Sequence, residues 1–358
     1  MKFETRCLND CLNWKLAHSI KLNNVRIPKT TLITEEHINL IKQAGYCELQ
    51  VFQLDDEDTD ENLAANTLAE HIAGPYTRID DSSRGRCNII ADTDGLVHFS
   101  AALQNFNAVD ESITLATLPN LKMVHKGQLL ATIKIIPYAI KNDLLAQALT
   151  NKEQIEISPF QPYKASLICS DTAFSAKNHS AIKNRINRTK GTLETTLNCQ
   201  HTIDDFAKAI KTTAEKPIEQ THSAIIKHQE PDLILISGIS AISDRRDVIP
   251  AALEKAGGQV IHLGMPVDPG NLLMLGAING KTVIGLPSCA KSPALNGFDW
   301  ILSRYAANIS LNSDQIKNMG IGGLLKEDQK RPSPRRTKAR QHKLTENHDG
   351  QHSDNNIS

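Results

Sequence analysis

The sequence predicts an α/β protein in which a mixed α+β N-terminal region precedes a doubly wound, mostly parallel sheet. In the second half, short apolar runs at 164–172 (KASLICSDT), 233–237, 259–263 and 282–286 alternate with helix-like stretches, as in βαβ units. In the first half, GQLLATIKIIPY at 127–138 is rich in β-branched residues and indicates a buried strand. The two halves therefore differ in the kind of sheet that we expect.

Changes in composition and pattern along the chain divide it into four predicted segments. These are an N-terminal α+β region at 1–72, a β-rich linker or scaffold region at 73–162, an α/β domain at 163–326 and a tail at 327–358. The tail is rich in charged residues, Pro, His, Asn and Ser and has few apolar residues, so we expect it to be disordered. Its basic stretch at 330–340 fits an RNA contact or a solvated terminus, and we favour the second.

Composition excludes several classes of protein. Lys plus Arg and Asp plus Glu each number 40, so no net field attracts nucleic acid or an anionic membrane. The seven cysteines form no CxxC pair, which argues against a disulfide framework or a zinc site. The first residues are too polar for a signal peptide and no run of 18 apolar residues occurs, so we expect a cytoplasmic protein.

The first motif is DLILISGISAISDRRDVIPAALEKAGG at 232–258, in which an apolar strand ends in a small-residue loop before a helix. Asp247 is the predicted N-cap, Pro250 falls in the first turn, and Gly257 and Gly258 end the helix. Such a loop lets an anion approach backbone N–H groups at a helix N-terminus. The small candidate binding residues are Ser237, Gly238, Ser240, Ala241 and Ser243.

Three charged residues follow that loop. Arg245 and Arg246 would strengthen a positive field, and both are candidate binding residues. Asp247 has two interpretations that the sequence leaves open. It is a plain helix cap, or it holds a metal, orients water or acts as a base beside a phosphate.

Two further loops offer polar atoms. GMPVDPGNLLMLG at 264–276 contributes the candidates Pro266, Asp268, Pro269, Gly270 and Asn271. GLPSCAKSPALNGFDW at 285–300 contributes the candidates Gly285, Pro287, Ser288, Cys289, Lys291 and Ser292. In the second of these, Ser292 is the predicted N-cap and Pro293 the first helical residue. Lys291 would give a point charge to a phosphate, whereas Cys289 fits a buried small residue better than a nucleophile.

Together these motifs carry a family resemblance. SGISAISDRRDVIPAAL resembles the GGTG-x-x-x-RD-V-x-P signature of molybdopterin-binding domains, which molybdopterin adenylyltransferases and molybdenum insertases share. GMPVDPGN and GLPSCAKSP resemble the paired PGKP and GLPGNP loops of that family. Further segments extend the resemblance, namely LAHS, ITLATLP, ATIKIIPYA and MGIGGLL. Together they make about residues 1–335 similar to a bacterial molybdopterin-binding module, which is often fused to a molybdenum cofactor nucleotidyltransferase-like domain. The chain stops where that domain would begin, so we expect its transferase activity to be absent.

The resemblance implies a ligand and alternative functions. The ligand is molybdopterin or the molybdenum cofactor, with the candidates of the three loops as binding residues and Asp247 as the catalytic and Mg²⁺-binding residue. The chain departs from the family's motifs at two places, and both departures favour binding over catalysis. Gly238-Ile239-Ser240-Ala241 stands where the family has GGTG, and Ser288-Cys289 stands where it has the Gly-Asn pair of GLPGNP.

The favoured function is therefore a binding protein for cofactor biosynthesis, insertion or delivery. The alternatives are an adenylyltransferase or insertase that uses Mg²⁺, and a scaffold or regulatory protein. The implied partners are a pterin phosphate, a molybdoenzyme or cofactor nucleotidyltransferase and, by analogy, a second copy of the chain. His18 in LAHS is interpreted as structural.

Overall fold

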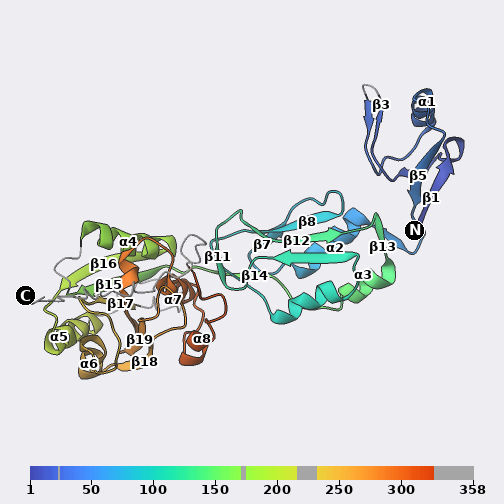
Figure 1. The fold of residues 1–358 in the computed structure, drawn as a ribbon. Coiled ribbons are helices and arrows are strands. Elements are labelled where there is room, and N and C mark those ends of the chain that lie inside the picture. Colours follow the sequence, from blue (N-terminus) through green and yellow to red (C-terminus); the bar gives the residue numbers. More distant parts are fainter. Residues whose placement is uncertain (23–24, 171–174, 216–231, 326–358) are drawn as a thin grey trace, which may run out of the picture.

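The computed structural model describes residues 1–22, 25–170, 175–215 and 232–325. The chain forms three bodies in a bent row, with the N-terminal body at one end and the largest body at the other (Figure 1). The tail that we predicted to be disordered, 327–358, lies outside the described residues.

The N-terminal body is a small antiparallel structure. Strands β1 (Lys2–Cys7), β5 (Glu48–Gln53) and β2 (Lys15–Leu16) form one sheet, and β3 (Ile20–Leu22) and β4 (Val25–Ile27) form a hairpin. Helix α1 (Glu35–Gln43) begins with a capping box, in which Thr34 is the N-cap and His37 the reciprocal partner. Its Ile41 is fully buried with Leu16 and Val51, so helix and sheet share one apolar core.

The central body is built from antiparallel sheets. One has the order β10 (Ile113–Thr117), β12 (Leu129–Ile135), β8 (Arg86–Ala91), β7 (Thr77–Ile79), and another the order β11 (Lys122–Val124), β9 (Gly95–His98), β14 (Glu156–Pro159). Strands β6 (Asp58–Asp60) and β13 (Ala139–Lys141) pair, and β12 confirms the strand predicted within 127–138.

Helical segments η1 (Leu8–Asp10), η2 (Ala101–Ala108), α2 (Glu61–Ile72) and α3 (Asn142–Ala148) complete the first two bodies. Helix α2 packs on β8 and β12 although we grouped its residues with the N-terminal region. The reason is its apolar face, since Leu68 and Ile72 are fully buried in the central core. The boundaries that we placed at 72, 162 and 326 remain predictions.

The C-terminal body contains a six-stranded sheet with helices on both faces. The strand order is β16 (Gly191–Asn198), β15 (Tyr163–Cys169), β17 (Asp232–Ser237), β20 (Lys281–Gly285), β19 (Met274–Ile278), β18 (Gln259–Leu263). Helices α4 (Ala176–Arg188) and α7 (Gly297–Ala306) contribute to one buried cluster, and α5 (Ile203–Ala214) and α6 (Val248–Lys255) to the other. Helix α8 (Ser313–Lys317) packs near β18.

We expected a doubly wound, mostly parallel sheet, whereas the structure has a mixed sheet in a mixed α/β protein. Strands β16, β15, β17 and β20 are parallel, whereas β19 and β18 are antiparallel to their neighbours. The cause is local, because Asn279 and Gly280 both have positive φ, 49° and 77°, between β19 and β20. An Asn-Gly pair in that conformation makes a two-residue hairpin, which forces an antiparallel return.

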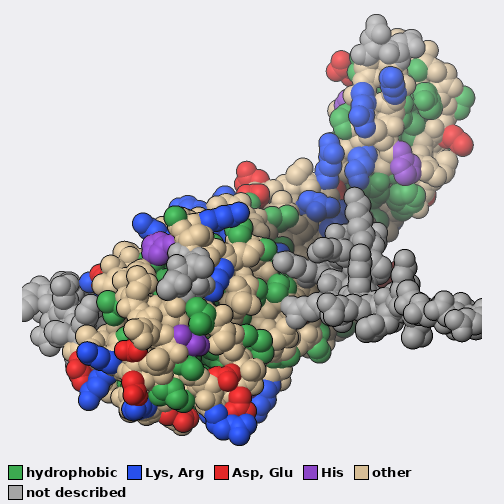
Figure 2. Space-filling model, turned by 60° about the vertical axis from the view of Figure 1, so that its left-hand side comes forward, with side chains coloured by type: hydrophobic (Ala, Val, Ile, Leu, Met, Phe, Trp, Pro, Cys, Tyr) green, Lys and Arg blue, Asp and Glu red, His purple; other side chains and the backbone are tan. Residues whose placement is uncertain are grey.

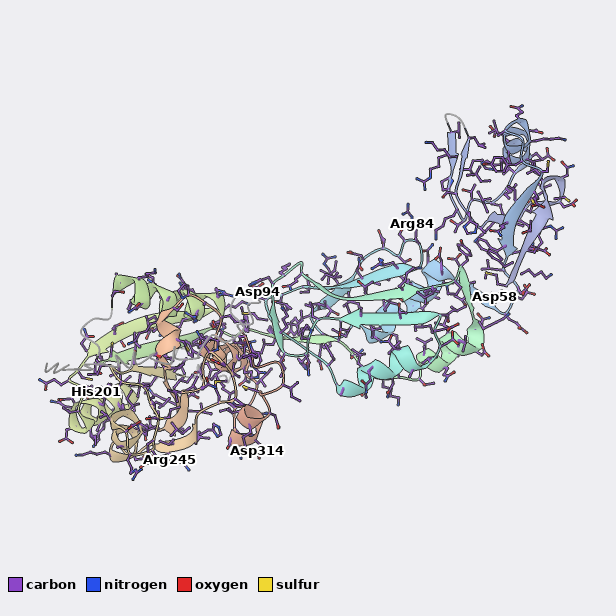
Figure 3. All side chains as sticks on the ribbon, in the orientation of Figure 1. Asp58, Arg84, Asp94, His201, Arg245 and Asp314 are labelled. Carbon is purple, nitrogen blue, oxygen red and sulfur yellow. The ribbon has the colours of Figure 1, made fainter. Side chains whose placement is uncertain are left out.

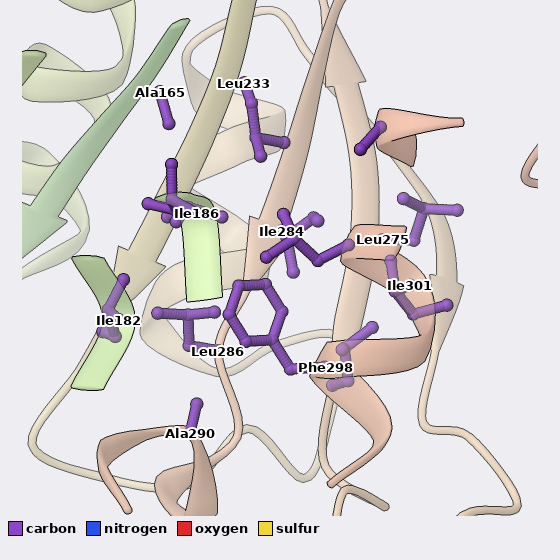
Figure 4. Packing of buried hydrophobic residues seen from close by; sticks show 14 of the residues in the cluster. Ala165, Ile182, Ile186, Leu233, Leu275, Ile284, Leu286, Ala290, Phe298 and Ile301 are labelled. Carbon is purple, nitrogen blue, oxygen red and sulfur yellow. The ribbon is translucent and has the colours of Figure 1, made fainter. Parts of the chain in front are cut away.

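One of the two apolar clusters lies directly beneath the loops of interest. Figure 4 shows the Phe298 ring of α7 next to Leu286 and Ile284, with Ala290 close by and Ile182 of α4 opposite. Phe298, Ile284, Ile182 and Ala290 have no exposed surface. Burying a side chain such as Phe298 contributes about 1.5–3 kcal/mol, so this cluster fixes α4 and α7 against the sheet.

One face of the molecule carries charged side chains of both signs, as the neutral composition leads us to expect (Figure 2). Figure 2 shows acidic and basic side chains interspersed over the C-terminal body, with basic side chains gathered near the junction with the N-terminal body. In the described ranges, no helix has the length and apolar character needed to cross a membrane.

Candidate functional site

The three predicted loops lie at one edge of the C-terminal sheet. Ser237 pairs with Cys169 in parallel register, and Gly285 pairs with Ile236, so β15, β17 and β20 end at the same edge. Met274 at the start of β19 is opposite Gly285, and Leu263 at the end of β18 is opposite Met274. The loops 238–247, 264–273 and 286–296 therefore emerge side by side. Open α/β folds bind ligands at this kind of edge.

Asp247 begins helix α6, as predicted, but its side chain does not cap the helix. Its Oδ2 accepts hydrogen bonds from the Ser243 backbone N–H at 2.6 Å, the Asp244 N–H at 2.9 Å and the Ser243 hydroxyl at 3.1 Å. The backbone donors of Ser243 and Asp244 lower the pKa of Asp247 below its ordinary value of 3.8. The carboxylate is thus ionised at neutral pH and braces the loop that precedes its helix.

The two arginines beside Asp247 have partners within the protein. Arg246 Nε lies 2.7 Å from Asp244 Oδ1, and this hydrogen bond lowers the pKa of Asp244 to about 2. Arg245 Nη1 donates to the Val260 carbonyl of β18 at 3.2 Å. Figure 3 accordingly places Arg245 beside the α6 and β18 side of the body. Both guanidinium groups are solvent-exposed, so salt screens their contribution to the field at the edge.

His201 is part of this edge, and our sequence reasoning missed it. Its Nδ1 lies 2.8 Å from Ser170 Oγ and its Nε2 lies 2.9 Å from Ser240 Oγ. The ring packs edge-to-face on Phe206 of α5 at a centroid distance of 5.7 Å (His201 in Figure 3). The sequence does contain a signal for it. His201 follows β16 by three residues, and β16 is a fourth parallel strand that ends at the same edge of the sheet. His201 therefore links the ends of two strands to the exposed Ser240.

Lys291 joins the first and third loops, since its Nζ donates to the Gly238 carbonyl at 3.4 Å. It belongs to the short 3-10 helix η3 (Ser288–Lys291), and Ser288 in the same turn is exposed. Pro287 is buried and Cys289 half-buried, and the fully exposed polar side chains of this loop are those of Ser288 and Ser292.

The predicted helix start in the third loop was wrong. Helix α7 begins at Gly297 with Asn296 as N-cap, four residues after the start at Pro293 with Ser292 as cap that we predicted, and Asp299 closes a capping box. The Asn296 side chain accepts from Phe298 N at 3.0 Å, and Asp299 Oδ2 accepts from Asn296 N at 2.9 Å. Two reciprocal hydrogen bonds outweigh the preference of Pro293 for a first turn. Ser292 Oγ instead accepts a local bond from Ala294 N at 3.3 Å.

A buried arginine holds the third loop in place. Arg185 of α4 donates from Nη2 to the carbonyls of Ser292 and Ala294 at 2.6 and 2.7 Å, and from Nε to Asp299 Oδ1 at 2.9 Å. Its side chain is 3% exposed and that of Asp299 is 13% exposed. The loop thus depends on one guanidinium that lies beneath it.

Two glycines predicted to contact a ligand are required by packing. A Cβ on Gly285 would lie 2.6 Å from Ile242 Cδ1 and 3.0 Å from Met274 Cβ. A Cβ on Gly270, which has φ +140°, would lie 2.6 Å from Gly297 N. These positions explain why the loops approach one another closely, independently of any ligand.

The second loop is fastened to its surroundings through its backbone. Gly297 N donates to the Pro269 carbonyl and Asp268 N to the Gly323 carbonyl, both at 2.8 Å. Met265 N donates to the Asn271 carbonyl at 2.9 Å, and the Asp268–Pro269 peptide is cis. Pro266 is exposed. This loop therefore frames the edge, while the exposed polar side chains come from the other two loops.

Comparisons with known proteins found little. No family model and no curated protein matches the chain. Among solved structures, it is similar to the crystal structure of the molybdopterin biosynthesis MoeA protein from Pyrococcus horikosii. The identity is 12% and the TM-score 0.30, over 86% of this chain and 76% of that one. At this TM-score the likeness says nothing about the ligand of the present chain.

Adding a methyl group at Gly285 tests the close packing of the first loop. We expect Gly285→Ala to lower the free energy of unfolding by about 1–3 kcal/mol, because overpacking displaces Ile242 and Met274. Urea unfolding followed by circular dichroism measures the change, with Ser288→Ala at an exposed position as the control. Equal stability of the two variants would show that the site accommodates a Cβ.

Removing the Arg185 charge tests the support of the third loop. We expect Arg185→Met to lower the free energy of unfolding by about 3–5 kcal/mol, because Asp299 and four carbonyls lose a buried partner. Lys183→Met, at an exposed position of the same helix, should change it by less than about 0.5 kcal/mol. Thermal and urea unfolding of both variants make the comparison, and similar losses in both would contradict the role of Arg185.

Proposed function

We propose that this protein binds molybdopterin or the molybdenum cofactor at the edge formed by loops 238–247, 264–273 and 286–296, and acts in biosynthesis, insertion or delivery of that cofactor. The observation that carries the proposal is the meeting of three loops, each with a motif resembling the same family, at one sheet edge. A chance resemblance in three separate loops has no reason to converge in space. A cytoplasmic location and a molybdoenzyme or nucleotidyltransferase partner belong to the same proposal.

The groups at the edge suit a phosphate better than a neutral ligand. Lys291 supplies an ammonium between the first and third loops, and Ser240, held by His201, supplies a hydroxyl. Ala241 and Ser243 are exposed and small, so a ligand can approach the backbone beside them. Phosphate esters are recognised by such combinations of a lysine, hydroxyls and loop backbone.

Removing the Lys291 ammonium tests the proposed phosphate contact. We expect Lys291→Ala to weaken binding of molybdopterin by about tenfold or more, since a charge-assisted hydrogen bond contributes about 1.5–3 kcal/mol. Bound pterin is measured by fluorescence after oxidation, following gel filtration of protein incubated with increasing molybdopterin. Lys208→Ala, on the exposed side of α5, is the matched control and should bind as the wild type does. Wild-type protein that retains no pterin would refute the proposed function.

A second candidate function is enzymatic, namely Mg²⁺-dependent adenylyl transfer to molybdopterin or molybdenum insertion. The observation in its favour is that all three hydrogen bonds to Asp247 go to Oδ2, and no described residue donates to Oδ1. That oxygen suits Mg²⁺, which takes one or two carboxylates and completes its shell with phosphates and water. The described residues contain no cluster of three or more His, Cys, Asp or Glu arranged for a metal.

Replacing Asp247 separates the two candidates. We expect wild-type protein to bind molybdopterin without Mg²⁺- and ATP-dependent adenylylation, and Asp247→Asn to keep that binding within about threefold, because an amide oxygen still accepts from the loop N–H groups. Turnover is followed by mass detection of adenylylated pterin. Turnover by the wild type that Asp247→Asn abolishes would establish the enzyme instead.

The pH dependence of the same loop has a defined sign. The pKa of Asp247 is depressed below 3.8, so its bracing of the loop is fully present above that pH and is lost as the pH falls through the folded-state value. Pterin binding should therefore not change through Asp247 between about pH 5 and 8. A binding transition in that range that disappears in Asp247→Asn would show that the carboxylate is not ionised as described.

A further inference from the structure

A cleft of about 790 Å³ lies between the central and C-terminal bodies, and of the residues in the three loops only Leu295 lines it. One wall is strand β11 with the turn that precedes it, including Met123 and Leu121, and the other is helix α7, with Trp300 and Arg304. None of the residues predicted for pterin binding lines it. Small-molecule sites typically have volumes of about 300–1,000 Å³ and mostly apolar walls with few polar groups.

Arg304 is the distinctive polar group of this cleft. The side chain is half-buried, and its Nη1 donates to the Trp300 carbonyl at 3.0 Å. The guanidinium carbon lies 5.7 Å from the Trp300 ring centroid. Burial lowers the pKa of Arg304, and no carboxylate of the described residues lies within 4.0 Å of its guanidinium. A partly desolvated guanidinium without a carboxylate is energetically unfavourable until an anion reaches it.

The other charges of the cleft do not supply that anion. Asp299 contributes to the wall, but its carboxylate is 2.9 Å from Arg185 Nε and closes the α7 capping box. Lys122 and Arg188 also line the cleft and are exposed, so they add positive charge at its rim. The cleft thus combines an apolar interior with an excess of cationic groups.

We propose that this cleft binds a small organic anion with a flat apolar body, whose acidic group meets Arg304 while its rings lie against Trp300 and Met123. The charge selects an anion over a neutral compound, and the apolar walls select a hydrophobic body over inorganic phosphate. This site is separate from the pterin site and does not depend on it.

Two fluorescent probes test the proposal because they differ in one charge. 8-Anilinonaphthalene-1-sulfonate is an aromatic anion, and N-phenyl-1-naphthylamine has the same rings without the sulfonate. The chain has two tryptophans, so a Trp14→Phe background leaves Trp300 as the energy-transfer donor that locates a bound probe. We expect saturable binding of one anionic probe per chain with energy transfer from Trp300.

Variants then identify the charge contact. Arg304→Gln should weaken the anionic probe by about tenfold and leave the neutral probe unchanged, and Arg304→Lys should retain most of the affinity. Leu295 lines the cleft and is 50% exposed, so Leu295→Asp and Leu295→Asn form a pair that differs only in charge. The Asp variant should bind the anionic probe more weakly than the Asn variant, with equal binding of the neutral probe.

Three results would overturn the proposal. The first is binding of the anionic probe that does not saturate. The second is an affinity for the anionic probe that neither Arg304→Gln nor the Leu295 substitutions change. The third is an equal loss of affinity for both probes in Arg304→Gln, together with equal affinities in Leu295→Asp and Leu295→Asn. The last result would show that Arg304 only maintains the shape of the cleft.

Discussion

The arrangement of the candidate site depends on the buried guanidinium of Arg185. It donates to Asp299 and to four carbonyls, those of Ala181, Ala290, Ser292 and Ala294. A buried charge is tolerated only when its hydrogen-bonding groups have partners, and a guanidinium has five donors to satisfy. The path of the third loop meets that requirement, because the loop bends around the guanidinium and brings three of its carbonyls to it. The position of Lys291 follows from this path.

The remaining loops are tied to that one by their backbones. Lys291 reaches the Gly238 carbonyl of the first loop, and Gly297 N reaches the Pro269 carbonyl of the second. Close approach is possible because Gly270 and Gly285 have no side chain where a neighbour lies. The three loops therefore form one unit, and a ligand would meet a preorganised surface rather than three independent segments.

Much of this edge could be predicted from the sequence because its signals are local. The apolar run before Gly238, the acid at position 247 and Gly257 after the helix each act through nearby backbone, and α6 begins and ends accordingly. What escaped prediction depends on partners distant in sequence. Arg185 and Asp299 are 114 residues apart, and Ser170 and Ser240 meet only through His201.

The errors have a different origin, because in each case another local signal outweighed the one that we used. Ser292 and Pro293 resemble a helix start, but the capping box of Asn296 and Asp299 is stronger, and Asp299 is held by Arg185. Asp247 has the identity and position of a cap, yet Ser243 and Asp244 offer its carboxylate backbone donors on the other side. The mixed character of the sheet follows from the Asn279-Gly280 hairpin, a signal that was present in the sequence and was not used.

Ser240 shows how this loop could bind a phosphate without the glycines of the family that it resembles. A neutral imidazole has one donor and one acceptor nitrogen. If Nδ1 of His201 carries the proton, Ser240 must donate to Nε2, and its hydroxyl then offers only lone pairs to a ligand. If Nε2 carries it, Ser170 donates to Nδ1, and the Ser240 hydroxyl is left to donate outward. A phosphate oxygen needs a donor, so under the proposed function the ligand selects the second tautomer. The contact that a glycine-rich loop makes through backbone N–H groups would then be made by a side-chain hydroxyl.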